Sequence, residues 1–139
     1  MTWFVWALLS AVFAAATAVL AKIGVAGIDS NLATAIRTSV VVLFAWLIVL
    51  GGASKANLGA IQFKTWTFLV LSGIATGLSW LCYFRALQLG PASKVAPVDK
   101  LSLVLVVLAA SIFLGERLTV ATGVGVALVV AGVLVLARG

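Results

Sequence analysis

Apolar stretches long enough to cross a bilayer follow one another along almost the whole chain, and this pattern most limits how the chain can fold. Hydrophobic residues make up 65% of the sequence and charged residues 9%, against roughly 25% charged residues in an ordinary soluble domain. So few polar side chains cannot build a surface that faces water. Because a spanning helix needs about 20 apolar residues, the 139 residues predict an all-α integral membrane protein with five transmembrane helices.

The five expected helices form a single transmembrane domain over residues 1–139. They occupy about residues 3–22, 31–50, 66–88, 93–114 and 119–137. Asp29 or Ser30 is the expected N-cap of the second helix. The first helix has no basic region before its apolar run, so we expect a retained span rather than a signal peptide.

The basic residues point to lipid as the charged partner. The formal charge is +6, but the nine lysines and arginines are spread singly from Lys22 to Arg138. Nucleic-acid binding requires a basic patch or stripe. Anionic lipid headgroups are the simpler counterion, so we expect contact with membrane lipid and no nucleic-acid partner.

The side chains of common catalytic and metal sites are scarce. The chain has no histidine, which is the commonest metal ligand and a frequent general base. Its single cysteine, Cys82, cannot form an internal disulfide. No serine or cysteine has an evident base beside it. We therefore expect neither an enzyme nor a bound cofactor or metal.

Several charged residues fall inside or at the ends of the expected spans. Ionised groups in a bilayer are costly and usually functional. Lys22, at the end of the first helix, either reaches the headgroups or closes a polar cavity. Arg37, about two turns into the second helix, either reaches the headgroups or contacts substrate. Arg85 lies near the end of the third helix, where it also can reach the headgroups.

Asp99 and Lys100 follow Pro97 in the first turns of the fourth expected helix. A helix N-terminus favours an ionised carboxylate. Consecutive helical residues point about 100° apart, so Asp99 and Lys100 are not expected to pair. At least one of them then needs a partner among Lys22, Arg37, Arg85 and Lys94. The alternative is an N-terminal carboxylate beside a lysine that reaches the headgroups.

Small and hydroxyl residues form stripes along two helices. The third helix has one face with Gly73, Gly77, Trp80 and Phe84, and an adjacent face with Ser72, Thr76, Ser79 and Tyr83. The glycines favour close helix packing, and the hydroxyls suit the lining of a passage. Alternatively, the hydroxyls bond to carbonyls of their own helix. The last helix carries a pairing face of Gly123, Ala127 and Ala131.

Four segments resemble an EamA-type domain of the drug/metabolite transporter superfamily. They are 10–25 (SAVFAAATAVLAKIGV), 31–38 (NLATAIRT), 83–102 (YFRALQLGPASKVAPVDKLS) and 113–119 (FLGERLT). The chain is similar to the short, five-helix bacterial and archaeal members, which implies a multi-pass location in a cell membrane. Larger relatives carry two such domains as inverted repeats, with ten helices around a cavity. The resemblance therefore implies that this chain corresponds to one half and that two copies form the pathway.

The loop charges bear on how those copies insert. One side of the membrane receives Lys55, Lys64 and Arg117, and the other receives Lys22, Lys94 and Arg138. This balance gives little orientation signal, although Arg37, Arg85 and Lys100 favour the second side as cytoplasmic. We expect an antiparallel homodimer by dual insertion, with a fixed N-out orientation as the rival.

The leading functional hypothesis is a secondary transporter that moves a small organic solute or metabolite by alternating access. Asp99 would bind the coupling ion or a substrate ammonium. Lys100, Arg37 and Arg85 would attract anionic groups of the solute. Trp80 and Tyr83 would form aromatic walls of the binding site. The predicted site comprises Asp99, Lys100, Arg37, Arg85, Lys22, Trp80, Tyr83, Ser79 and Thr76.

Two alternatives remain. A proton-coupled exporter like the small multidrug resistance relatives would use a glutamate in the first helix, but the first helix here has no acidic residue. A non-transporting membrane subunit that stabilises or regulates another membrane protein fits the small-residue faces equally well.

Overall fold

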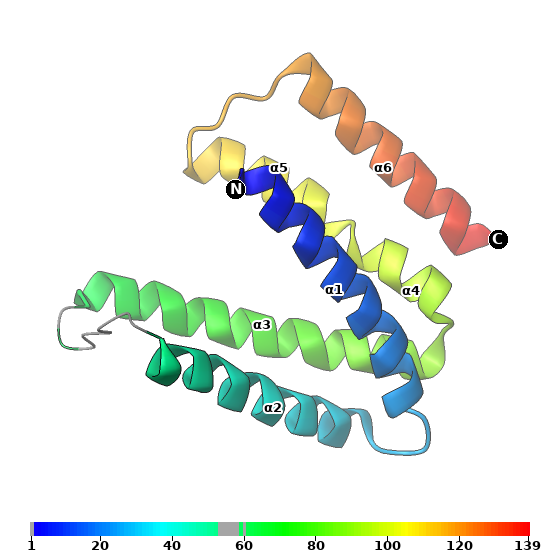
Figure 1. Ribbon diagram of the computed structural model, residues 1–139. Coiled ribbons are helices and arrows are strands. Elements are labelled where there is room, and N and C mark those ends of the chain that lie inside the picture. The colour runs from blue at the N-terminus through cyan, green and yellow to red at the C-terminus, as the bar shows by residue number, and fades with distance from the viewer. Residues whose placement is uncertain (1, 53–58, 60) are drawn as a thin grey trace. The chain divides into compact units, whose positions relative to one another are not determined.

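The computed structural model describes residues 2–52, 59 and 61–139, and within these ranges all regular structure is helical (Figure 1). Lys55, which entered the loop-charge count, lies outside the described residues. Five helical segments of the described chain are long and apolar enough to cross a membrane: α1 (Trp3–Gly24), α2 (Ser30–Gly51), α3 (Phe63–Leu89), Ala92–Phe113 and α6 (Val120–Arg138). The predicted all-α fold with five spanning helices is confirmed.

The fourth span is not one continuous helix. It consists of α4 (Ala92–Asp99) and α5 (Ser102–Phe113), separated by Lys100 and Leu101. The N–H groups of these two residues donate to Pro97 O and Val98 O, each at 3.0 Å. These hydrogen bonds join residues that are three apart, as in a 3₁₀-helix, which is wound more tightly than an α-helix. The break therefore lies within the span, about 12 Å from its start at 1.5 Å per residue.

Most large apolar side chains point outward. Phe63 is 87% exposed and Val120 is 86% exposed. Such exposure would be unfavourable in water, but hydrocarbon tails solvate these side chains in a bilayer. Since helices satisfy their own backbone hydrogen bonds, they are suited to this environment.

The chain divides into two compact units, which we call the terminal unit (residues 1–20 and 89–139) and the central unit (residues 21–88). In the terminal unit, α6 packs mainly against α4 and to a smaller extent against α5. Ala110 and Val133 are buried there.

Most of the FLGERLT segment (residues 113–119) forms the turn between α5 and α6. Gly115 has a φ of 69°, a left-handed conformation that glycine adopts without strain. The Glu116 backbone N–H donates to Ala110 O at 3.2 Å. Thr119 then caps α6, its Oγ1 accepting from the Thr122 N–H at 3.1 Å. Glu116 thus closes the turn through its backbone.

In the central unit, α2 and α3 run side by side (Figure 1). The turn before α2 contains Gly27, at a φ of 80°. Asp29 is the N-cap, as predicted, and its Oδ1 accepts from the N–H groups of Asn31 and Leu32 at 2.9 and 3.1 Å. The buried residues of this unit gather near this turn and the end of α3: Ala21, Val25, Ser30, Ala33, Thr34, Phe84 and Leu87.

The glycine stripes do not make the close helix contacts that their spacing predicts. A Cβ placed on Gly73 or Gly77 would meet nothing within 4 Å, and the same holds for Gly123 and Gly125 of α6. Both glycine surfaces are therefore open within the part of the protomer that the structure describes.

Candidate functional site

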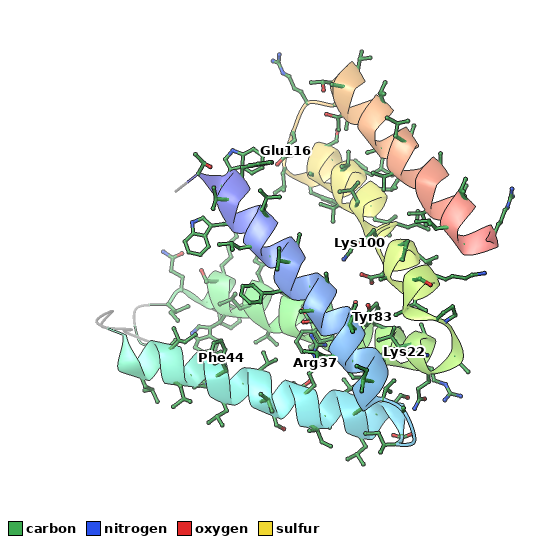
Figure 2. The ribbon with its side chains drawn as sticks, turned by 45° about the vertical axis from the view of Figure 1, so that its right-hand side comes forward. Lys22, Arg37, Phe44, Tyr83, Lys100 and Glu116 are labelled. Carbon is green, nitrogen blue, oxygen red and sulfur yellow. The ribbon has the colours of Figure 1, made fainter. Side chains whose placement is uncertain are left out.

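Arg37 points from α2 toward α3 and lies against two aromatic rings (Figure 2). Its Cζ is 4.3 Å from the centroid of the Trp80 ring and 5.4 Å from that of Phe84. Because Trp80 and Phe84 are one helical turn apart, they share a face of α3. A cation over an aromatic face gains roughly 2 kcal/mol when it is desolvated. The Arg37 guanidinium therefore contacts protein within the central unit, and contact with substrate stays a prediction.

Tyr83 belongs to the same group of side chains. It is half-buried and interacts electrostatically with Arg37. We call Arg37, Trp80, Tyr83 and Phe84 the Arg37 cluster. Arg37 lies about 10 Å along α2 from Ser30 at 1.5 Å per residue, so the cluster lies within the span and not at its end.

The Arg37 cluster contains no carboxylate. The chain has three acidic side chains. Asp29 caps α2, Asp99 pairs with Lys100, and Glu116 is exposed in the α5–α6 turn. Within the described ranges, no ion pair involves Arg37. The guanidinium is thus held by aromatic faces without a protein anion to balance its charge.

A groove of about 630 Å³ lies between α2 and α3. It is lined by Asn31, Thr34, Ala35, Thr38, Ser39, Val42, Leu43, Trp46, Gly77 and Leu81. The Thr34, Thr38 and Ser39 hydroxyls donate to carbonyls four residues earlier, at 2.8, 2.7 and 3.0 Å. Their oxygens can still accept a hydrogen bond. This hydroxyl stripe was missed in the sequence, although the four-residue spacing of Ser30, Thr34 and Thr38 was visible there.

The hydroxyl residues that were predicted on α3 are not gathered around Arg37, apart from Tyr83. Thr76 Oγ1 donates to Ser72 O at 2.9 Å, which is the alternative of bonding within the helix. Thr76 and Ser79 are both exposed in the protomer. They remain available to line a passage, but no contact in the described chain ties them to the cluster.

Lys22 links the end of α1 to the end of α3. Its Nζ donates to Leu87 O. Pro91, four residues after Leu87, has no N–H with which to continue the helix pattern, so the lysine supplies a donor to that carbonyl. Lys22 also lines a cavity of about 280 Å³ with Val25, Ala26, Gly27, Leu87 and Gln88. A role for Lys22 in closing a polar cavity stays a prediction.

Arg85 is separate from the Arg37 cluster. Its Nη1 donates to Gln88 Oε1 at 3.0 Å, and Gln88 Nε2 donates to Ile28 O at 2.6 Å. The Arg85 side chain is exposed. This chain of hydrogen bonds joins α3 to the loop before α2, which is a positioning role.

The prediction that Asp99 and Lys100 cannot pair is wrong. Lys100 Nζ lies 3.4 Å from Asp99 Oδ2. The helical argument fails because α4 ends at Asp99, and Lys100 is its C-cap with ψ of −7°. Asp99 is therefore at a helix C-terminus, where the dipole favours the lysine and opposes the carboxylate. The side chains are 38% and 63% exposed for Asp99 and Lys100.

The predicted site residues thus fall into separate groups. Arg37, Trp80 and Tyr83 come together, whereas Lys22 and Arg85 support the end of the central unit. Asp99 and Lys100 form a pair in the terminal unit. Among the described residues, no group of three or more histidine, cysteine, aspartate or glutamate side chains could hold a metal ion.

Comparisons with known proteins agree on a transport function. The EamA-like transporter family matches residues 1–138. A Sinorhizobium protein named "Uncharacterized transporter in cobO 3'region" is 53% identical over 136 residues, which are 98% of this chain and 96% of the relative. Proteins named "Probable 4-amino-4-deoxy-L-arabinose-phosphoundecaprenol flippase subunit ArnE", from Yersinia pseudotuberculosis and Yersinia pestis, are 36% identical over 72 residues, or 52% of this chain and 63% of each relative. No solved structure matches the chain.

Proposed function

We propose a specific transport activity for this chain, which belongs to the EamA-like transporter family and is a multi-pass membrane transporter. In this proposal it is a secondary transporter that carries a small organic solute or metabolite by alternating access. Membership in a transporter family favours movement of a solute over its chemical conversion.

The observation that carries the proposal is the position of Arg37. A charged side chain inside a span is costly and tends to mark a solute or ion pathway. Arg37 lies over Trp80 and Phe84 rather than along α2 toward the end of the helix. A purely anchoring arginine would be expected to keep its guanidinium at the headgroups.

The broken fourth span gives independent support. Many transporters bind solutes and coupling ions where a spanning helix is interrupted. Here the interruption between α4 and α5 carries the Asp99–Lys100 pair. We assign Asp99 to the binding of the coupling ion or of an ammonium group of the solute. In this assignment, the pair between Asp99 and Lys100 opens when the ion or the ammonium group binds.

We further propose that two copies form the pathway, in antiparallel orientation. A single five-helix chain corresponds to half of the ten-helix relatives that it resembles. The open glycine surfaces of α3 and α6 have room for a neighbouring helix. Close approach at small residues is the usual way in which spanning helices associate.

A second candidate follows from the ArnE relatives, whose name describes a flippase subunit. By that likeness, this chain would be one component of a heteromeric transporter. The likeness covers about half of the chain, so it supports this candidate less than the full-length family match supports transport in general.

Reconstitution of the purified chain into proteoliposomes tests the proposal. Liposomes loaded with a metabolite mixture should take up labelled solutes by counterflow, with saturable kinetics. Empty liposomes and liposomes containing an unrelated membrane protein are the controls. Flux that appears only when a second, co-purified protein is added would favour the subunit candidate and contradict transport by the chain alone.

A further inference from the structure

We infer that the Arg37 cluster recognises an organic anion, so the transported solute carries a carboxylate or phosphate group. This inference rests on the proposed transport function and specifies its substrate class. The four residues of the cluster lie on α2 and α3 within the central unit.

The first step is the charge balance. Asp29 is committed to two backbone N–H groups, and Asp99 is committed to Lys100. Glu116 lies in the α5–α6 turn, which is at the opposite side of the membrane from the α1–α2 turn when each span crosses once. No acidic side chain of the chain is therefore left for Arg37. An anion from outside the chain would supply the missing charge.

The second step is the geometry of the guanidinium. The Trp80 and Phe84 rings lie against Arg37 with Cζ distances of 4.3 and 5.4 Å. Stacking on a ring uses the face of a guanidinium and leaves the N–H donors at its edge. Those donors match a carboxylate or phosphate in a bidentate arrangement. The aromatic side chains thus hold the Arg37 guanidinium in position for an anion, but they do not neutralise its charge.

The third step excludes the opposite charge class. Within the helices of the central unit, Lys22, Arg37, Lys64 and Arg85 carry positive charge, and these helices contain no acidic residue. A solute that carries only positive charge would meet net repulsion in this unit, and this repulsion is stronger in a low-dielectric interior than in water. An anionic solute would meet attraction.

Ligand-dependent thermal unfolding in phosphatidylcholine nanodiscs tests this assignment. The probes are inorganic phosphate, acetate, benzoate and phenyl phosphate, with neutral benzamide and cationic benzylamine as matched comparisons. Ligands that bind the folded state raise its stability. At least one organic anion should stabilise the wild-type protein more than benzamide or benzylamine does.

Two substitutions at Arg37 and one control make the test specific. Arg37→Gln should weaken anion binding by about tenfold or more, because a charge-assisted pair is lost. Arg37→Lys keeps the charge but lacks the planar fork, so it should fold and bind with intermediate affinity. Arg85→Gln removes the same charge from an exposed position on α3 outside the Arg37 cluster, so it should lower anion affinity much less than Arg37→Gln does, because an exposed charge is screened. Circular dichroism checks that each variant retains its helices.

The outcomes separate this inference from the proposed function. Equal stabilisation by benzoate and benzamide, no stabilisation by any anion, or equal losses in Arg37→Gln and Arg85→Gln would overturn the anion assignment. Flux of neutral or cationic solutes under those conditions would leave transport standing. Arg37-dependent anion binding without any flux would contradict transport instead.

A last arm identifies the source of the anion. Adding phosphatidylglycerol to the nanodiscs supplies the same chemistry as a lipid headgroup. If it competes with benzoate in the wild-type protein and has no effect in Arg37→Gln, the bound anion is a headgroup. If benzoate binding is unchanged, the anion is a free solute.

Discussion

Lys22 and Arg37 are both basic residues of the central unit, but their side chains make different kinds of contact. The Lys22 ammonium donates to one backbone carbonyl, at Leu87, whereas the Arg37 guanidinium lies over the rings of Trp80 and Phe84. A compact ammonium suits a single acceptor, and a planar guanidinium suits an aromatic face. Their roles are therefore distinguishable by substitution.

Replacing Lys22 with methionine should lower the free energy of unfolding by about 1 to 3 kcal/mol, because a charge-assisted hydrogen bond to the Leu87 carbonyl is lost. Unfolding in mixed detergent micelles, followed by tryptophan fluorescence, measures the change. Lys64→Met is the matched control, since Lys64 is exposed near the start of α3. Equal stability of the Lys22 variant and the wild type would show that the contact with α3 is not stabilising.

Asp99→Asn should reduce solute flux and flatten its dependence on pH, because the assigned ion site loses its carboxylate and Lys100 loses its partner. Flux in proteoliposomes over a range of pH measures both effects. Asp29→Asn is the control, since asparagine also caps a helix well. Unchanged flux and pH dependence in Asp99→Asn would remove Asp99 from the site.

The sequence alone could predict which residues were unusual but not which ones meet. Arg37, Trp80 and Tyr83 stood out as charged or aromatic residues in spans. Their contact depends on the rotation of α2 and α3 about their axes, which periodicity does not determine for helices that are apolar all round. The pairing of Asp99 with Lys100 was missed for a different reason, because it depends on a helix end inside an apolar run.

At the scale of elements, the five spans were predictable because each is long and apolar. The interruption between α4 and α5 was not, since the apolar pattern continues through Leu101 to Leu105. Close packing at the glycine stripes was expected, and it is absent from the described protomer. A position with open space above it, such as Gly125, can report on contacts between protomers.

Gly125→Leu should leave the folded protomer intact but weaken association of two copies, because a Cβ at this position would meet nothing within 4 Å in the described part of its own chain. Size-exclusion chromatography with light scattering in detergent measures the mass of the complex. Val124→Leu, at a neighbouring exposed position, is the control. A dimer that survives Gly125→Leu unchanged would place the interface elsewhere.

At the scale of the whole molecule, the proposed antiparallel dimer requires the chain to insert in both orientations. The near balance of loop charges permits this. A fluorescent or protease-sensitive tag at the C-terminus should be accessible from both faces of the membrane in cells and in inside-out vesicles. Access from one face only would contradict dual insertion and favour the fixed N-out orientation.

The central claim is that the chain carries a solute past the charged and hydroxyl residues of its spans, along a path that a small polar reagent can also enter. The most direct test is cysteine accessibility in a Cys82→Ala background, with a small charged thiol reagent applied to membranes. Thr76→Cys, one turn from Trp80, should react and should be protected by the transported solute. Leu78→Cys, on an exposed apolar position of α3, should not react because it faces lipid. No reaction at position 76, or equal reaction at both positions, would contradict the account.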